Sequence, residues 1–404
     1  SLFEPKTDDM PGLEIFGEEE RKHIEDVMNS GVLMRYNFEP LRNAHWKAKE
    51  FETAIQEKLK VAYAHLSSSG TTALITSIKA LGIGAGDEII MPPFTFVASF
   101  EAILFTGAIP VFADIDDTLT LSPDSVRKAI TPRTKAIMPI HMCGAMADMD
   151  ELMKIAQENN LWVIEDACQA IGGKYKGKYL GTIGHIGCLS FDFVKTITCG
   201  EGGVILTNDL SKYDYCHRFT DHGHDHLGND RGAENHPIIG LNFRISELQS
   251  AIGLAQWTKL DQILNKQKSI KNSIKNILKE NTDVKFRRIP DKEGDNASFL
   301  SLFLESENLA RRVIRELKSS GIPSAYWYDN NWHYVRKWDH FKALKSDTTL
   351  FKEQRDLLPD YESQDFTQSD EIIKKTITIP LSLKWTEEEI REIGEKIVKI
   401  IINQ

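Results

Sequence analysis

The sequence predicts an α/β protein built around a mostly parallel β-sheet. Between residues 61 and 210, short apolar runs alternate with segments of helical periodicity. This alternation is typical of a parallel sheet that helices cover on both faces. The predicted strands are 61–66, 88–91, 109–113, 136–140, 162–165, 186–191 and 204–207. The predicted helices between them are 71–81, 97–106, 123–129 and 149–159.

The length and the later pattern predict a second, smaller domain. A chain of 404 residues, with 41% hydrophobic and 27% charged residues, can form a large core and more than one domain. We expect a large domain over 1–255, with an N-terminal arm, and a smaller α+β domain over 256–404. Residues 1–9 are polar and predict a loose terminus. Outside the main sheet, helices are expected at 17–28, 46–59, 246–257, 260–279, 309–319 and 387–401, and strands at 299–304 and 378–383.

Charge and cysteine content exclude several classes of function. The net charge of −10 argues against a nucleic-acid partner, which would require a basic face. The five cysteines form no CxxC pair and no regular framework, which is typical of a reducing cytoplasm. No signal peptide and no apolar run of about 18 residues is visible, so neither secretion nor a membrane span is expected.

One lysine is placed where chemistry is expected. Residues 190–203 read SFDFVKTITCGEGG, with Lys195 on a turn between two strand-like runs. A lysine held between buried strands can act as a nucleophile towards a carbonyl carbon. The alternative is a plain hairpin with a solvated lysine at its tip, and this stretch alone does not separate the two.

Two further stretches supply partners for such a lysine. Residues 67–74, SSSGTTAL, join a strand to a helix, and the N–H groups of a helix N-terminus suit a phosphate. An ordinary helix N-cap by serine or threonine would explain the same residues. Residues 162–170, WVIEDACQA, end a buried strand on Glu165 and Asp166, where α/β sheets bind ligands. An aspartate there can keep a pyridinium nitrogen protonated.

Six motifs in this order carry a resemblance to a known family. They are SSGTTAL, PPFTFVAS, HMCGAMADMDEL, EDACQAIG, SFDFVKTITCGEGG and GLNFRISELQSAIG. Over about residues 11–400 the chain resembles the DegT/DnrJ/EryC1/StrS sugar aminotransferases. The resemblance implies the pyridoxal-phosphate fold-type I architecture, with a seven-stranded large-domain sheet, and pyridoxal 5'-phosphate as the cofactor.

The resemblance also implies roles for individual residues. Lys195 would bind the cofactor covalently, and Asp166 would hold its ring nitrogen protonated. Phe96 would stack on the pyridine ring and Gln169 would contact O3′. The cofactor phosphate would be bound by Gly70, Thr71, Ser190 and, in a homodimer with shared sites, by Asn242 of the neighbouring subunit. His141, in HMCG, is expected to be structural.

Three segments are candidates for substrate contacts. Arg35 and Tyr36 lie in a loop that is near substrate in the family, although a packing loop is an equal alternative. Five of the twelve histidines lie within 217–236, and HGHDH at 222–226 could form a metal site. We favour a substrate-facing loop without a metal, in which His222, His224 and Arg231 meet the ligand. Tyr328 and His333 belong to YWYDNNWHY, an aromatic segment bulkier than the one usual in the family.

These features predict an aminotransferase that moves the amino group of L-glutamate to a keto or aldehyde sugar. The shared stretches resemble most the branch that acts on 8-oxo-3,8-dideoxy-manno-octulosonate, a free acid sugar of surface polysaccharide. A nucleotide-linked keto sugar is the alternative acceptor. A related sugar dehydratase carries histidine in place of Lys195, which argues against that activity. A cofactor-binding regulator would be expected to carry a basic helix-turn-helix, which this sequence lacks.

Overall fold

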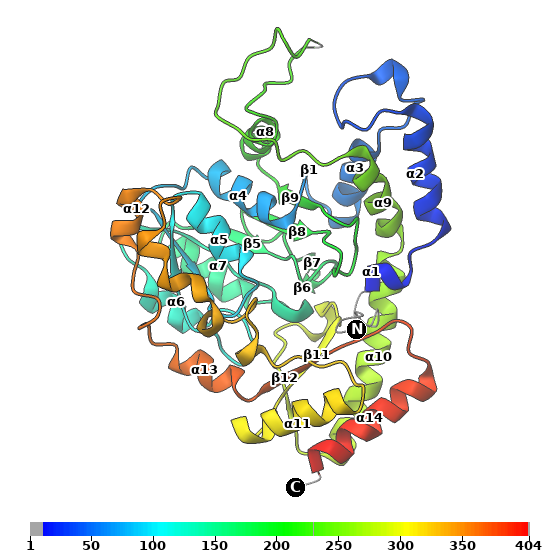
Figure 1. Ribbon diagram of the computed structural model, residues 1–404, viewed down its shortest axis with the longest axis vertical. Helices are drawn as coiled ribbons and strands as arrows, with labels where there is room; N and C mark the ends of the chain where they lie inside the picture. The colour runs from blue at the N-terminus through cyan, green and yellow to red at the C-terminus, as the bar shows by residue number, and fades with distance from the viewer. Residues whose placement is uncertain (1–10, 229, 403–404) are drawn as a thin grey trace.

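The computed structural model describes residues 11–228 and 230–402, so the terminus expected at 1–9 lies outside the described residues. Its centre is a seven-stranded sheet with the order β1-β9-β8-β5-β4-β2-β3 (Figure 1). The strands are β1 (Tyr63–Ser67), β2 (Glu88–Met91), β3 (Ile109–Phe112), β4 (Thr134–Ile137), β5 (Trp162–Asp166), β8 (Ile186–Ser190) and β9 (Gly203–Thr207). The predicted α/β class and seven strands are confirmed, with boundaries that differ by at most three residues.

The sheet is parallel except at one strand. The pairs β2–β3, β2–β4, β4–β5 and β5–β8 are parallel, whereas β9 runs antiparallel to both β8 and β1. The segment between β8 and β9, which carries Lys195, is therefore a hairpin connection rather than a helical crossover. The helices between the other strands are α4 (Gly70–Ala80), α5 (Ala98–Phe105), α6 (Pro123–Ala129) and α7 (Met149–Glu158).

An N-terminal arm packs on a helix from the middle of the chain. It comprises α1 (Pro11–Glu14), α2 (Glu18–Ser30) and α3 (Lys47–Leu59), and α2 and α3 both pack against α9 (Glu247–Thr258) (Figure 1). The start of α9 is fixed by a capping box, because Ser246 accepts from the amide of Gln249 and the Gln249 side chain accepts from the amide of Ser246.

A three-stranded antiparallel sheet forms a second, smaller layer. Its order is β10 (Lys285–Phe286), β11 (Phe299–Phe303) and β12 (Thr376–Pro380). The long helix α10 (Leu260–Asn281) leads into it and packs against α14 (Glu387–Ile402), while α11 (Glu307–Ser319) contacts both β12 and α14. Leu278, Leu302 and Ile397 belong to the separate hydrophobic core of this layer.

The segment that joins β11 to β12 returns to the large sheet. Tyr334, Trp338 and Phe366 lie in the same hydrophobic core as α4 and α5. This segment contains α12 (Lys352–Leu357) and α13 (Thr367–Ile373). The division at 255/256 therefore remains a prediction, and residues 327–373 of the expected small domain pack on the large one.

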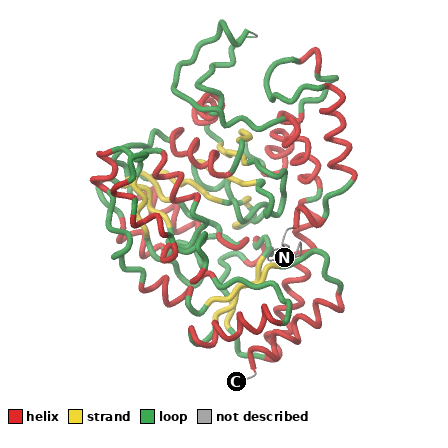
Figure 2. Tube along the Cα trace, viewed as in Figure 1, coloured by secondary structure: helices red, strands yellow, loops and turns green. Residues whose placement is uncertain are grey.

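Several elements were not expected from the sequence, among them a hairpin and a helix of the large domain. β6 (Lys174–Tyr175) and β7 (Lys178–Tyr179) form a short hairpin, and α8 (Leu210–Phe219) begins at the side-chain cap Asp209. After α8 the chain extends as a long loop before α9 (Figure 2).

Within residues 11–228 and 230–402, no helix is long and apolar enough to cross a membrane. The five cysteines are all free.

Candidate functional site

Seven predicted residues from separate parts of the chain line one cavity. The cavity has a volume of about 310 Å³ and lies at the strand ends that carry Asp166 and Ser190. Its lining includes the predicted residues Gly70, Thr71, Phe96, Asp166, Gln169, Ser190 and Lys195. The fold thus brings together every predicted cofactor residue except Asn242.

The start of α4 is held tightly against two strand ends. Ser69 caps the helix, because its side chain accepts from the amide of Thr72 at 3.1 Å. A Cβ at Gly70 would lie 2.8 Å from Cβ of Ser190, and one at Gly203 would lie 2.4 Å from the carbonyl of Ser69. Glycine is therefore required at both positions, and the helix N-terminus opens into the cavity, where it suits an anion.

Asp166 ends β5 with its carboxylate oriented by two donors. The hydroxyl of Ser99 donates to Oδ2 at 2.8 Å, and the amide of Cys168 donates to Oδ1 at 3.1 Å. Asp166 is buried but still lines the cavity, so a ring nitrogen placed there would meet a fixed carboxylate.

The neighbouring acid, Glu165, is used for structure. Its carboxylate accepts from Nε2 of His141 at 2.9 Å and from the amides of Gly181, Ile183 and Gly184. The amide of Ala147 donates to Nδ1 of His141, so the proton of this ring lies on Nε2. The expected structural role of His141 agrees with these contacts.

Lys195 stands between this cavity and a second one. Its amide donates to the carbonyl of Asp192 at 3.0 Å within the turn after β8. The second cavity, of about 320 Å³, extends to β11 and β12 and also has Lys195 and His333 in its lining. Ser298 lines it with a buried hydroxyl that has no hydrogen-bond partner among the described residues, so this hydroxyl is available to a ligand.

His333 faces both cavities in one defined protonation form. Its Nδ1–H donates to Oδ1 of Asn330 at 2.9 Å, because that oxygen can only accept. Burial and the positive charge of Lys195 lower the pKa of His333 to about 3. The ring is therefore neutral near pH 7, and Nε2 is free to accept a hydrogen bond from a ligand.

Cys168 does not compete with Lys195 as a nucleophile. Its thiol lines both cavities, but burial and the nearby Asp166 carboxylate raise its pKa. A protonated thiol is a poor nucleophile, so the lysine amine is the group suited to attack a carbonyl here.

The residues of the first cavity fit pyridoxal phosphate. A helix N-terminus with hydroxyls suits the phosphate, Asp166 suits the pyridinium, and Lys195 suits the aldehyde. The ring of Phe96 lies at the cavity with about a third of its surface exposed, and Trp332 stacks on it at 5.7 Å. An aromatic face is thus available to a planar ring.

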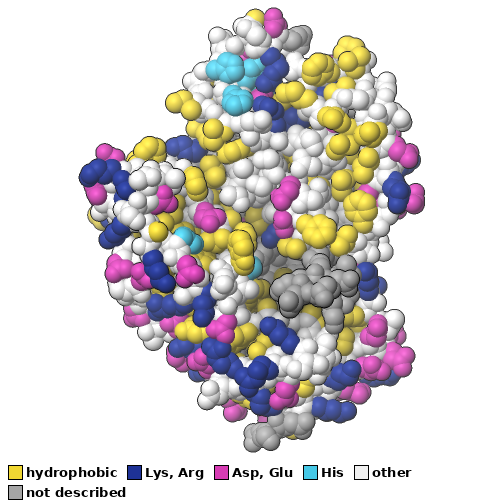
Figure 3. All heavy atoms as spheres, viewed as in Figure 1, with side chains coloured by type: hydrophobic (Ala, Val, Ile, Leu, Met, Phe, Trp, Pro, Cys, Tyr) yellow, Lys and Arg dark blue, Asp and Glu magenta, His cyan; other side chains and the backbone are white. Residues whose placement is uncertain are grey.

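A third and larger cavity gathers most of the predicted substrate residues at the far end of the molecule. It has a volume of about 1120 Å³, and its lining includes Arg35, Tyr36, His224 and Arg231 but not Lys195. It lies between the loop before α3 and the loop after α8. Figure 3 shows the histidines gathered with Lys and Arg side chains at this end. Within one chain, these residues do not line the Lys195 cavities.

Arg35 is committed to internal contacts. Its Nη1 donates to the carbonyl of Leu66 at 3.0 Å, and Nη2 donates to Glu52 at 2.7 Å. Burial opposes its charge, but the Glu52 carboxylate outweighs burial and raises the pKa of Arg35. The hydroxyl of Tyr36, next to it, is buried and has no hydrogen-bond partner within residues 11–228 and 230–402, so it is available to a ligand.

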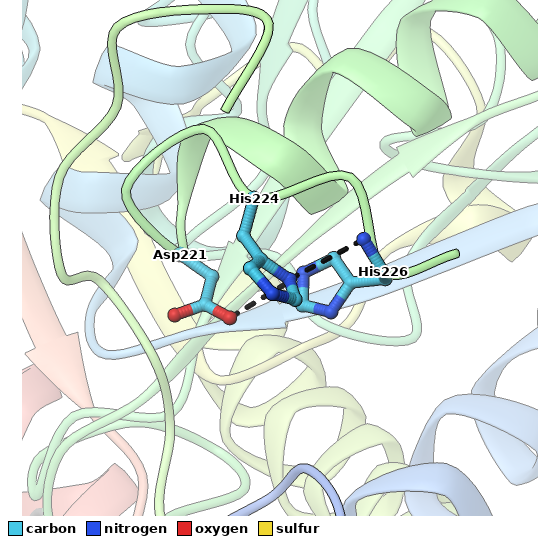
Figure 4. Close-up of side chains that lie close together, drawn as sticks. All are labelled: Asp221, His224 and His226. Carbon is cyan, nitrogen blue, oxygen red and sulfur yellow. Dashed lines mark hydrogen bonds and ion pairs between the residues drawn. The ribbon is translucent and has the colours of Figure 1, made fainter. Parts of the chain in front are cut away.

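Asp221, His224 and His226 lie close enough to hold a metal ion (Figure 4). Their contacts favour an ion-pair network instead. Asp221 already accepts hydrogen bonds from two guanidinium groups. Nδ1 of His224 accepts from the amide of His226, which leaves the proton on Nε2, and this nitrogen lies 2.5 Å from Glu234. A protonated nitrogen has no lone pair for a metal.

Three predicted residues lie apart from all these cavities. Asn242 is exposed, and its side chain accepts from the amide of Arg244 at 3.3 Å. His222 is exposed, and its carbonyl accepts from His236. Tyr328 packs against Tyr334 with ring centroids 5.6 Å apart. A substrate contact of Tyr328 therefore stays a prediction.

Sequence reasoning missed four residues of the site. Ser99 and Trp332 lie within motifs that were recognised, but their partners are distant in sequence. Asn330 fixes the tautomer of His333, and Ser298 lies 103 positions beyond Lys195. For Ser99 a signal existed, since it follows Phe96 by three residues at the start of a helix and shares its end of the sheet.

Comparison with known proteins agrees with this geometry. The profile of the DegT/DnrJ/EryC1/StrS aminotransferase family matches residues 14–398. The GDP-perosamine synthase of Escherichia coli O157:H7 is 42% identical over 244 residues, which are 58% of this chain and 66% of that protein. The aligned part is thus just under two thirds of that relative. The protein SpsC of Bacillus subtilis, named for spore coat polysaccharide biosynthesis, is 28% identical over 96% of both chains.

Solved structures share the fold over nearly the whole chain. An aminotransferase from Psychrobacter cryohalolentis is 28% identical with a TM-score of 0.82, covering 96% of this chain and 98% of that one. PseC from Helicobacter pylori, at 23% identity, has a TM-score of 0.83 over 98% of both chains and supports the fold alone. The chain belongs to the DegT/DnrJ/EryC1/StrS aminotransferase family, whose members are pyridoxal-phosphate-dependent enzymes.

Proposed function

We propose that the protein transfers the amino group of L-glutamate to a keto or aldehyde sugar, with Lys195 as the catalytic residue. The observation that carries the proposal is the placement of Lys195 between a cavity that fits pyridoxal phosphate and a second cavity towards β11 and β12. The bound cofactor would supply an electron sink for amine chemistry.

The residues of the chain then have separate tasks. The start of α4, through Gly70 and Thr71, and Ser190 would hold the phosphate, while Asp166 would keep the ring nitrogen protonated. The amine of Lys195 would bind the cofactor and, when a donor amine displaces it, move the proton from the α-carbon of the donor. Ser298 and neutral His333 would bind groups of the substrate in the second cavity.

A homodimer with shared sites would explain the large third cavity. Arg231, Tyr36 and His224 lie away from Lys195 within one chain, and Asn242 is exposed next to Leu241, which is also exposed. Each chain would offer these residues, with Asn242 towards the phosphate, to the Lys195 cavity of its partner. Amino donor and acceptor would then bind at a site built from two chains.

For the acceptor we propose 8-oxo-3,8-dideoxy-manno-octulosonate, which would give 8-amino-3,8-dideoxy-manno-octulosonate. The reaction would take place in the cytoplasm, and its product would be used for the lipopolysaccharide of the cell surface. Support comes from the stacked pair of Phe96 and Trp332, which lies beside His333, and from Arg231 as a carboxylate partner. The alternative is a nucleotide-linked keto sugar. It is supported by the GDP- and UDP-sugar names of the relatives, at 42% and 41% identity, and by the 1120 Å³ of the third cavity.

A panel of acceptors would decide between them. The protein, loaded with pyridoxal phosphate and L-glutamate, would be assayed with the free 8-oxo acid sugar and with GDP- and UDP-linked keto sugars. We expect the highest kcat/KM for the free acid sugar. A higher value for a nucleotide-linked sugar would refute this acceptor and leave the transaminase activity intact. No release of 2-oxoglutarate with any acceptor would refute the transfer itself.

A further inference from the structure

We propose that Ser99 is a positioning residue for Asp166, and that through it the hydroxyl pair Thr95–Ser99 sets how tightly the site holds the ring nitrogen of pyridoxal phosphate. The inference rests on the proposed function, in which Asp166 contacts that nitrogen. It assigns to the PPFTFVAS motif a role beyond the stacking ring of Phe96.

The contacts form a short chain of hydroxyl groups that ends on the carboxylate. Oγ of Ser99 lies 2.8 Å from Oδ2 of Asp166, and Oγ1 of Thr95 lies 2.9 Å from Oγ of Ser99. Both hydroxyl residues are about 1% exposed. Water therefore cannot replace either donor easily, and the carboxylate depends on Ser99 for one of its two oriented oxygens.

The direction of the hydrogen bonds follows from the number of protons. A carboxylate accepts, so the single hydroxyl proton of Ser99 points to Asp166. Between Thr95 and Ser99, only Thr95 can then be the donor, and the carbonyl of Phe96, 3.1 Å from Oγ1 of Thr95, competes for the same proton. Successive hydroxyl donors polarise one another in a buried site, which strengthens the bond that reaches the carboxylate.

The backbone holds this chain of hydroxyls in place from outside. The amide of Thr95 donates to the carbonyl of His333 at 3.0 Å, and the amide of Val97 donates to the carbonyl of Trp332 at 2.8 Å. The same turn, residues 95–99, therefore presents Phe96 to one side of the cavity and Ser99 to the carboxylate. The backbone carbonyls of residues 332–333 therefore hold both Phe96 and Ser99 in position.

The test measures cofactor binding rather than turnover. Apoprotein would be titrated with pyridoxal phosphate and with its 1-deaza analogue, in which carbon replaces the ring nitrogen, following protein fluorescence. The analogue cannot engage Asp166. We expect Ser99→Ala to weaken binding of pyridoxal phosphate about tenfold, since a bond to a charged group is affected, and to change binding of the analogue less than about twofold.

Three further variants make the result specific. Ser99→Thr keeps the hydroxyl and should restore the preference for pyridoxal phosphate. Thr95→Val removes the outer hydroxyl and should weaken the same preference less, about threefold, even if Ser99→Ala folds poorly. Thr106→Val is the matched control, because this hydroxyl lies at the other end of α5 and donates to the carbonyl of Ile103. It should change neither affinity.

The outcomes separate this inference from the proposed function. Equal weakening of both ligands by Ser99→Ala would mean a merely structural role and would overturn the inference. Asp166→Asn should abolish the preference for pyridoxal phosphate. If Asp166→Asn keeps the preference, the role of Asp166 in the proposed function is wrong. If Asp166→Asn loses it but Ser99→Ala and Thr95→Val keep it, only the role of Ser99 is wrong.

Discussion

Arg231 forms a bidentate ion pair with Asp221, in which its two Nη atoms donate to the two carboxylate oxygens at 2.8 and 2.9 Å. Two acidic residues, Asp230 and Glu234, lie closer to Arg231 in the sequence. The structure instead ties Arg231 to the second residue after α8. Arg244 donates to the same carboxylate, so one buried acid joins the loop to the strand-like segment before α9.

Loss of the Asp221 charge should destabilise the protein in a pH-dependent way. Burial alone would raise the pKa of Asp221, but Arg231 and Arg244 outweigh it and lower the pKa to about 2. The stabilisation is then complete above the ordinary pKa of 3.8 and is lost as the pH falls through 2. Asp221→Asn should cost about 2 kcal/mol at pH 7, and the deficit should shrink between pH 4 and about pH 2.

Urea unfolding at several pH values would measure this deficit. Asp124→Asn is the matched control, because Asp124 is exposed and lies 4.0 Å from Arg127. It should change stability by less than about 0.5 kcal/mol. A deficit for Asp221→Asn that stays constant down to pH 3 would show that its charge is not the cause.

Arg231 should affect the acceptor more than the donor. Two of the five N–H donors of Arg231 bind Asp221, so in the proposed dimer the other three remain available to the acceptor. Arg231→Ala should raise KM for the acid sugar about 10- to 150-fold, as expected for a lost bond to a charged group. Arg231→Lys keeps the charge but not the forked guanidinium group, so its KM for the acid sugar should lie between those of the wild type and Arg231→Ala.

Stopped-flow measurement of the two half-reactions gives the test. The rate with L-glutamate alone should change little in both Arg231 variants. Equal losses in both half-reactions, or in neither, would assign Arg231 to holding its own loop through Asp221.

Lys195 should carry the covalent bond to the cofactor. Borohydride reduction of the loaded protein followed by peptide mass spectrometry should place the cofactor on Lys195. Lys195→Ala should show no such adduct and should lose turnover, since its amine serves both as attachment and as base. Lys212→Ala is a control that should retain both, because Lys212 lies on α8 and lines neither Lys195 cavity. Full transaminase activity in Lys195→Ala would refute the central assignment.

Two inactive variants should restore activity when mixed. Asn242 is exposed in the chain and lies outside both Lys195 cavities. If it serves the site of a partner, hybrids of Lys195→Ala and Asn242→Ala chains contain one intact site per dimer. Random mixing should recover up to about a quarter of wild-type activity, on the population arithmetic of linked sites. No recovery after proven subunit exchange would contradict a shared site.

Local pattern was enough to predict the sheet and the cofactor cavity. The strand-like runs are apolar, and acids or hydroxyls follow them, so Asp166 and Ser190 could be placed at strand ends before any contact was known. The sequence also shows glycine at 70 and 203, although only the structure shows which atoms exclude a side chain at these positions. In both cases the decisive information lies within a few residues of sequence.

The path of residues 327–373 could not be predicted in the same way. Their aromatic side chains suit any core, and only packing against α4 and α5 decides which core they join. The same limit applies to Arg35 and Arg231, because their residue type predicts a ligand contact as readily as the ion pairs with Glu52 and Asp221 that the structure shows.

By itself, the sequence determined the α/β class, the order of the main strands along the chain, and the placement of Lys195 and Asp166 beside strand ends. It did so because each of these depends on local periodicity or on residues that adjoin a strand end. The tertiary structure alone decided that Ser99 donates to Asp166, that His333 is neutral with a free Nε2, and that the histidine loop forms ion pairs. These features depend on which distant side chain lies within hydrogen-bond distance. Charge and burial, rather than local pattern, decide which side chain that is.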